Sequence, residues 1–251
     1  MDHQVIGTTM PVLEVKLGPG ESVVAESGEL SWMTSSINMH TATAKAGSKG
    51  VLGVVKRAVA GGSIFMTEYT AEGTEGMVAF ATKVPGRIVP IHVDANRQYM
   101  VHRGGFLCAV PGVNLEIGFQ QKLSAGFLGG EGFILQKISG VGDAWVEIDG
   151  ELVEYDLGPD EVLRVHPGHV GLFDATVAFE ITRIKGIKNM FFGGDGIFLA
   201  QLRGPGKVLL QTMPLINLAG ALAPYIAASN GSDSGSGSGF SLGSVAKLIN
   251  D

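Results

Sequence analysis

Histidines and acidic residues are the side chains of this sequence whose types and spacing could do chemistry. His166 and His169 form an HPGH pair, and His102 lies 64 residues before His166. A metal needs three or four converging ligands, whereas Pro-Gly between two histidines predicts a turn. Glu131 and Asp195, also 64 residues apart, could pair as catalytic carboxylates or bind a cation. Turn histidines and turn-capping or solvated acids are the simpler interpretation, so these four positions are only weak ligand candidates.

Other patterns of reactive residues are missing. The sequence has no His-x-His, which removes the main support for a cupin-type metal site. GGEGF and GGDGI precede β-like segments and lack a Gly-Lys-Ser/Thr ending, so a phosphate-binding loop is not indicated. Cys108 is the single cysteine and lies among apolar residues, which predicts a buried thiol and no internal disulfide. We therefore expect no enzyme activity, no catalytic residue, no metal and no cofactor.

The glycine-rich segments around Glu131 and Asp195 repeat each other. GGEGFILQKISGVG at 129–142 recurs without a gap as GGDGIFLAQLRGPG at 193–206, and LGPGESVVAESG at 17–28 returns as LGPDEVLRVHPG at 157–168. The same offset of 64 places a middle copy at VHRG, 101–104. Three tandem units are therefore predicted, over about 10–83, 84–149 and 150–213. The repeat glycines are Gly61, Gly62, Gly129, Gly130, Gly132, Gly140, Gly142, Gly193, Gly194, Gly196, Gly204 and Gly206.

Short β-strands are expected to hold these glycines in place. Segments such as ESVVAE, GMVAFAT and GFILQKI are rich in branched and aromatic residues and are bounded by Gly, Pro or Asp, which is typical of strands. Each repeat glycine predicts a backbone corner where a Cβ would clash. Asp149-Gly150 predicts a two-residue hairpin, and the Gly-Val-Gly and Gly-Pro-Gly triplets predict turns or bulges between paired strands. The fold class is all-β, in one folded region over 1–229.

The C-terminal part divides into an apolar segment, 214–229, and a Gly/Ser-rich tail, 230–251. The apolar segment predicts a short helix that packs on the protein or on a neighbouring subunit. Polar residues and prolines interrupt it, so no membrane span is expected, although peripheral membrane contact stays open. The tail predicts a flexible linker, with a short helix or docking peptide near its end as the alternative.

The charge balance bears on the partners. A formal net charge of −6 and a pI near 5.5 leave no overall positive field for nucleic acid. The basic cluster of Lys45, Lys49, Lys56 and Arg57 predicts a solvated loop, or contact with an anionic partner. The first residues, MDHQVIGTTMPVLEV, contain no basic region followed by a long apolar one, so the cytoplasm is the expected location.

Several motifs together resemble a known family. LGPGESVVAESGELSWM, GGSIFMTEY, PGRIVPIHVD, GGEGFILQKISGVGDAWVEIDG and GPGKVLLQT are similar, in order and spacing, to the altered inheritance of mitochondria protein 24 family. This resemblance implies three β-sandwich or shortened double-stranded β-helix repeats in a pseudo-threefold arrangement, like the subunit of the trp RNA-binding attenuation protein (TRAP). It implies ring or prism builders that often form trimers, and it offers no catalytic residues. Mitochondrial members are linked to inner-membrane organisation. We see no transit peptide in this sequence, so that role is not simply transferred to it.

The sequence thus favours a non-enzymatic, homo-oligomeric β scaffold, with a trimer favoured, that presents surfaces to an unknown protein partner. The alternative is a small-ligand-binding module or enzyme that uses a cleft between repeats, with His102, His166, Glu131 and Asp195 as polar contacts. RNA binding by analogy with the attenuation protein is a third hypothesis, which the acidic charge disfavours.

Overall fold

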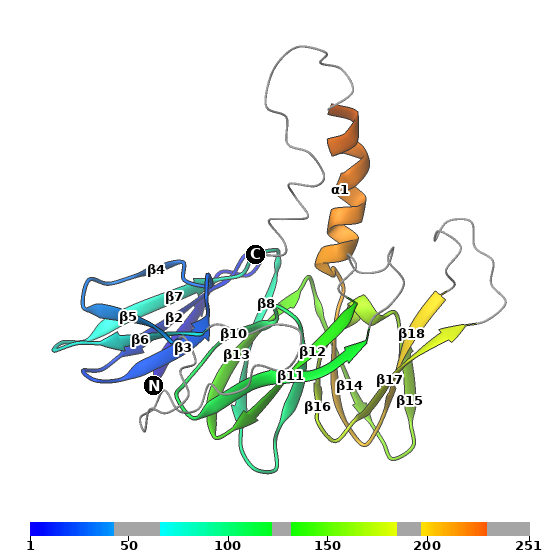
Figure 1. Cartoon of the computed structure of the whole chain (residues 1–251), viewed down its shortest axis with the longest axis horizontal. Coiled ribbons are helices and arrows are strands. Elements are labelled where there is room, and N and C mark those ends of the chain that lie inside the picture. The colour runs from blue at the N-terminus through cyan, green and yellow to red at the C-terminus, as the bar shows by residue number, and fades with distance from the viewer. Residues whose placement is uncertain (43–65, 122–131, 185–196, 230–251) are drawn as a thin grey trace.

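The computed structural model describes residues 1–42, 66–121, 132–184 and 197–229. Within these ranges the protein is all-β, as expected, with a 3-10 turn at Pro167–His169 and one α-helix, α1 (Leu215–Ser229). The strands form four antiparallel sheets that lie one after another along the molecule, from the blue and cyan strands at one end to the yellow strands at the other (Figure 1).

The first sheet has four strands and the fourth has three, while the two sheets between them have six strands each. The first sheet runs in the order β1 (Asp2–Ile6), β2 (Val12–Leu17), β7 (Gly76–Ala81), β4 (Trp32–Met33). The second runs β5 (Ile37–Ala42), β6 (Met66–Ala71), β3 (Ser22–Glu26), β10 (Phe106–Ala109), β13 (Gly142–Asp149), β8 (Gly86–Val93). The third runs β11 (Val113–Gln121), β12 (Phe133–Gly140), β9 (Tyr99–His102), β16 (Val170–Asp174), β19 (Gly206–Gln211), β14 (Leu152–Leu157). The fourth runs β15 (Val162–Val165), β18 (Ile197–Arg203), β17 (Ala178–Ile184).

Three apolar cores lie between these four sheets. Strand β13 shows why a core lies on each face of the second sheet: Trp145 packs in the first core, and its neighbour Val146 packs in the second. Strand β16 does the same in the third sheet, with Leu172 in the second core and Phe173 in the third. A strand covered on both faces is apolar at successive positions, which accounts for continuous segments such as FLCA on β10.

The glycine turns join strands of different sheets, so the hairpin prediction at Asp149-Gly150 is wrong. Strand β13 pairs with β10 and β8, whereas the next strand, β14, pairs with β19 in the third sheet. Likewise, Gly140 and Gly142 connect β12 of the third sheet to β13 of the second. The turn chemistry sets the local backbone, and Gly150 does have a positive φ of 77°, but it does not select the partner strand.

Two of the repeat glycines within the described residues, Gly140 and Gly204, have close backbone neighbours. A Cβ at Gly140, whose φ is +100°, would lie 2.2 Å from the carbonyl oxygen of Gly112. A Cβ at Gly204 would lie 2.4 Å from the carbonyl oxygen of Gly158. Real Cβ atoms do not approach backbone atoms so closely, so both corners need glycine.

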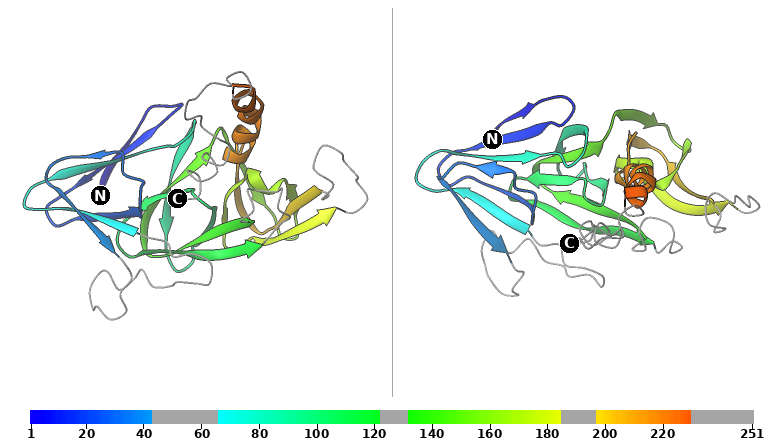
Figure 2. Two further views of the ribbon diagram at one scale, coloured as in Figure 1. Left: turned by 45° about the horizontal axis from the view of Figure 1, so that its top comes forward. Right: turned by 90° about the horizontal axis from the view of Figure 1, so that it is seen from above.

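Helix α1 follows β19 and points away from the sheets (Figures 1 and 2). Its first turn contacts the sheets through Asn217, whose Nδ2 lies 3.3 Å from Nε2 of His169. The expected helix is present, but most of its described side chains are exposed, so the expected packing on its own chain is limited to its base. No helix among the described residues is long and apolar enough to cross a membrane.

Candidate functional site

The two candidate ligand histidines, His102 and His166, lie in different sheets or beside them and do not form one site. His102 ends β9 in the third sheet, while His166 follows β15 of the fourth sheet and packs edge-to-face on His169, with ring centroids 5.9 Å apart. Among the described residues, no group of three His, Cys, Asp or Glu side chains is arranged to hold a metal. Glu131 and Asp195 lie outside the described residues, as do Gly61, Gly62, Gly129, Gly130, Gly193, Gly194, Gly196 and the basic cluster.

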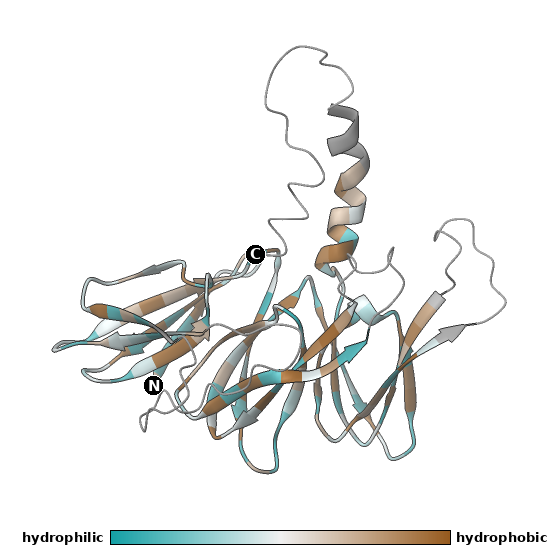
Figure 3. Cartoon of the chain, viewed as in Figure 1, coloured by the Kyte–Doolittle hydropathy of each residue, from teal (hydrophilic) through white to brown (hydrophobic). Residues whose placement is uncertain are grey.

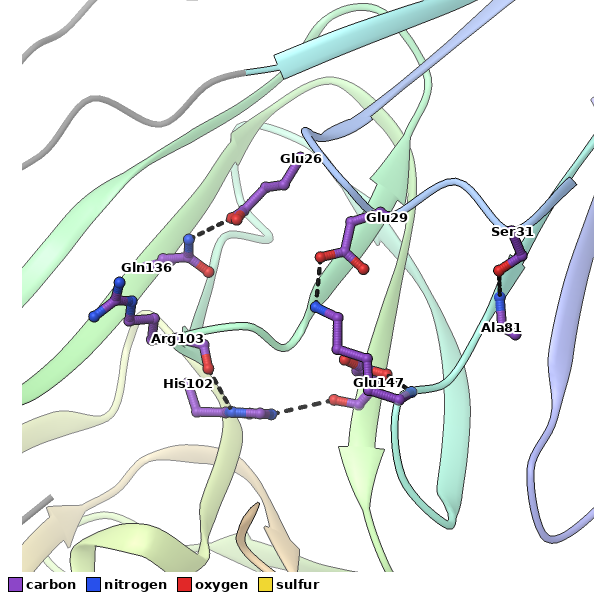
Figure 4. Close-up of polar contacts among 9 residues, drawn as sticks. Glu26, Glu29, Ser31, Ala81, His102, Arg103, Gln136 and Glu147 are labelled. Atoms are coloured by element: carbon purple, nitrogen blue, oxygen red, sulfur yellow. Dashed lines mark hydrogen bonds and ion pairs between the residues drawn. The ribbon is translucent and has the colours of Figure 1, made fainter. Parts of the chain in front are cut away.

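Polar side chains from the first three sheets meet around His102 (Figure 4). Glu26 ends β3 and Glu29 follows it, Lys83 follows β7, Gln136 lies on β12, and Glu147 lies on β13. We call this group the inter-sheet cluster: Glu26, Glu29, Lys83, His102, Gln136 and Glu147.

An ion pair between Glu29 and Lys83 forms one half of the cluster. Glu29 Oε1 lies 2.5 Å from Lys83 Nζ; the Glu29 side chain is only 8% exposed, and that of Lys83 is 50% exposed. The backbone N–H of Lys83 also donates to Oε2 of Glu147, with an N···O distance of 3.4 Å. Lys83 thus links a buried carboxylate to a second buried carboxyl group and leaves part of its own charge in water.

His102 and the Glu26–Gln136 pair form the other half. Gln136 Nε2 donates to Glu26 Oε1 at 2.5 Å. His102 Nδ1 lies 3.0 Å from the carbonyl oxygen of Arg103, and Nε2 lies 3.3 Å from that of Glu147. Burial lowers the pKa of His102, although the charge of Asp149 opposes the shift. The lowered pKa favours the neutral imidazole, which donates a hydrogen bond from only one nitrogen. Gly105 makes room for this ring, since a Cβ there would lie 2.5 Å from His102 Nε2.

Burial also sets the ionisation of the acidic groups. It raises the pKa of Glu147 to about 7, although the charge of Lys83 opposes the shift. Burial raises the pKa of Glu26 too, against the hydrogen bond from Gln136. For Lys83, burial lowers the pKa, but the charge and hydrogen bond of Glu29 outweigh it and the net shift is upward. The cluster therefore favours protonated Glu147 and charged Lys83 in weakly acidic solution.

This ionisation makes the stability depend on pH. Folded Glu147 keeps its proton up to about pH 7, whereas the ordinary carboxyl pKa is 4.5. Between those values the folded state binds more protons than the unfolded state, so the free energy of unfolding falls as the pH rises. At about 1.4 kcal/mol per pKa unit, the loss is on the order of 3–4 kcal/mol. We expect Glu147→Gln to flatten this slope in urea unfolding measured between pH 5 and pH 8, because an amide does not titrate.

Glu75→Gln is the matched control for this prediction, since Glu75 lies in an exposed turn. It should leave the slope as it is in the natural chain. A Glu147→Gln variant whose pH dependence equals that of the natural protein contradicts the assignment. Part of the slope is expected to persist in the variant, because burial raises the pKa of Glu26 and Asp149 in the same direction.

A carboxyl group that titrates near neutrality is suited to general acid–base catalysis. Catalysis needs the group to reach a substrate, however, and only 4% of Glu147 is exposed. Its described neighbours are occupied with one another, Glu29 with Lys83 and Glu26 with Gln136. The thiol of Cys108 is fully buried on β10, as the sequence predicts, and burial raises its pKa. These contacts suit a structural joint between sheets.

Sequence reasoning found only His102 of this cluster. Glu29, Lys83 and Glu147 are separated by 54 and 64 positions, and the stacking of sheets brings them together. One signal is available: Lys83, Glu147 and Gln211 are spaced by the repeat offset of 64, and each lies within two residues of the end of its strand. Gln211 also makes a buried contact, accepting the N–H of Asp149 at 3.1 Å. A polar residue that recurs every 64 positions beside an apolar strand therefore indicates a contact between neighbouring sheets.

Comparisons with known proteins agree with this architecture. An uncharacterised protein of Streptococcus pyogenes serotype M6 is 25% identical over 226 residues, which is 88% of this chain and 88% of that protein. A crystal structure of a Streptococcus pyogenes protein matches with a TM-score of 0.70 and 22% identity, covering 89% of this chain and 99% of the other. That similarity supports the fold. The family model described as "Mitochondrial biogenesis AIM24" matches residues 3–213. The family resemblance of the sequence is thereby confirmed, and the chain belongs to the mitochondrial biogenesis AIM24 family.

Proposed function

We propose that this protein is a non-enzymatic β scaffold of the cytoplasm that associates with copies of itself, with a trimer favoured, and presents surfaces to protein partners. The observation that carries the proposal is the apolar surface of its edges and helix. Strands β1 and β4 are the two edges of the first sheet, and Ile6 and Trp32 on them are 41% and 46% exposed. On α1, Leu222 is 48% exposed. Apolar groups at open sheet edges and on a projecting helix are suited to protein contacts.

The body of this scaffold is proposed to contain three TRAP-like repeats in a pseudo-threefold arrangement. The strand orders of the two six-stranded sheets support the repeats: adding six to each strand number of the second sheet gives the order of the third. Under this proposal, each unit gives three strands to each of two neighbouring sheets. The expected boundaries near 83 and 149 fall between strands β7 and β8 and between β13 and β14.

The self-association is tested by mixing two versions of the purified full chain that carry different affinity tags. After subunit exchange, capture of one tag is expected to recover the other version in comparable amount. Recovery of the captured version alone, after mixing at micromolar concentration under partly dissociating conditions, contradicts the proposal. Because no other protein is present, the experiment does not depend on an unidentified partner. We propose no nucleic-acid partner, since the chain carries a net charge of −6.

A second candidate function is the binding of a small polar ligand at the inter-sheet cluster. Gln136 is 4% exposed, and its Oε1 has no hydrogen-bond partner among the described residues. An unpaired buried oxygen costs free energy unless water or a ligand satisfies it. Metal analysis of the purified protein and thermal-shift screening with small polar molecules test this candidate. A shift that Gln136→Leu removes would favour ligand binding over the purely structural joint.

A further inference from the structure

The described part of α1 is uncovered on most sides. Leu215, Ile216 and Leu222 are 40%, 39% and 48% exposed, and a Cβ added at Gly220 would meet no atom within 4 Å outside the helix backbone. Figure 3 shows this part of the helix coloured mostly as apolar, with a hydrophilic band near its base. An apolar helix is stable in water when another surface covers it, and the described sheets do not supply that surface.

The base of α1 is nevertheless fixed. The backbone N–H groups of Asn217 and Leu218 donate to the carbonyl oxygen of Pro214 at 2.8 and 3.2 Å. His169 lies between the helix and the third sheet, with Nε2 3.3 Å from Nδ2 of Asn217 and Nδ1 2.8 Å from the carbonyl oxygen of Gln211. Since Nδ1 can only donate to that carbonyl, Nε2 of a neutral ring accepts from Asn217. The sheets therefore hold the first turn and present the rest of the helix in one direction.

The charge distribution decides what covers the helix. No charged residue occurs between Val208 and Ser232, while the whole chain carries −6. Helices that lie on lipid surfaces use Lys and Arg to attract anionic headgroups, and α1 has none. Its 15 residues span about 22 Å, short of the roughly 30 Å of a bilayer core. A second copy of the chain brings an identical uncharged helix and meets no repulsion there.

We propose that α1 is the contact through which copies of this chain associate, as a parallel bundle with Leu215, Leu218 and Leu222 at its seam. The proposal rests on the homo-oligomer proposed above and adds the element that makes it. These leucines are spaced by three and four residues, the spacing of a helix–helix seam. A stable interface buries roughly 1,200–2,000 Å², and a short helix approaches that area more readily when it contacts two others, as in a trimer, than when it contacts one. The area therefore favours three copies.

Two substitutions at one position test the bundle in the full-length protein. Leu222→Glu places one carboxylate per copy in the apolar seam, and we expect it to weaken self-association by more than about tenfold in sedimentation velocity. Thr74→Glu, in the exposed turn between β6 and β7, adds the same charge elsewhere and should leave the association unchanged. Leu222→Cys is expected to form disulfide-linked dimers under mild oxidation, and Thr74→Cys is not. Because Cys108 is fully buried, the introduced thiol is the reactive one.

The outcomes separate this inference from the proposed function. Dissociation by Leu222→Glu together with cross-linking of Leu222→Cys supports the helix bundle. An oligomer that survives Leu222→Glu and does not cross-link through Leu222→Cys overturns the bundle, while the self-associating scaffold stands. A natural chain that is monomeric at high micromolar concentration overturns both.

Discussion

Trp145→Ala is expected to lower the free energy of unfolding by about 3–5 kcal/mol, the usual loss when a large buried aromatic side chain is truncated. Trp145 is 1% exposed on β13 and packs in the first core. The ring of His3 lies edge-on to it, with centroids 5.1 Å apart. The truncation leaves a cavity between the first and second sheets, because the remaining strands of that core are held in place by their hydrogen-bonded neighbours. Urea unfolding of the two proteins measures the difference.

The other tryptophan supplies the control. Trp32 lies on the edge strand β4 and is 46% exposed, so Trp32→Ala should cost less than about 1 kcal/mol. If β13 is shared between two cores as described, the losses differ by several-fold. Equal losses for the two variants are incompatible with a buried Trp145.

Gly140→Ala is expected to cost more than about 3 kcal/mol, because two penalties add. The φ of +100° at Gly140 is a conformation that alanine rarely adopts, and the new Cβ would lie 2.2 Å from the carbonyl oxygen of Gly112. That oxygen also accepts the N–H of Val141 at 3.1 Å, so moving it away disturbs the corner between β12 and β13. The loss is measured by thermal or urea unfolding.

Gly20→Ala separates the two penalties. Gly20 has a similar φ of +81°, but a Cβ there would meet no atom within 4 Å, so only the backbone strain remains, at about 1–2 kcal/mol. A Gly140→Ala variant no less stable than Gly20→Ala would show that the close approach at the corner does not exist. Gly204→Ala is expected to follow Gly140→Ala, since its Cβ would lie 2.4 Å from the carbonyl oxygen of Gly158.

The backbone corners at the glycines can be predicted from the sequence, whereas the pairing of the strands cannot. Gly140 and Gly142 indicate a corner because the need for a missing Cβ is local, and both have positive φ angles. The partner of β13 is not a local property. Successive apolar positions such as Ala144, Trp145 and Val146 show that the strand is buried, but they suit any sheet with a core on each face, so the adjacent strand β14 was wrongly predicted to pair with it.

The candidate site was even less accessible to sequence reasoning. Glu29 and Lys83 come from segments that follow β3 and β7 of different sheets, and nothing in either segment indicates the other. Glu147 is an acid inside the apolar segment AWVEI, which indicates an unusual environment but not its partners. For α1 the composition predicts an apolar helix, whereas its direction depends on the contacts of His169 with Asn217 and Gln211 at its base.

We propose that the chain is a β body whose described interior polar groups hold sheets together and whose exposed apolar groups bind further copies of itself. The deciding measurement is light scattering coupled to size exclusion on the full-length protein at micromolar concentration. We expect one species with three times the chain mass of 26.2 kDa. A single species of 26.2 kDa that persists as the concentration is raised contradicts it.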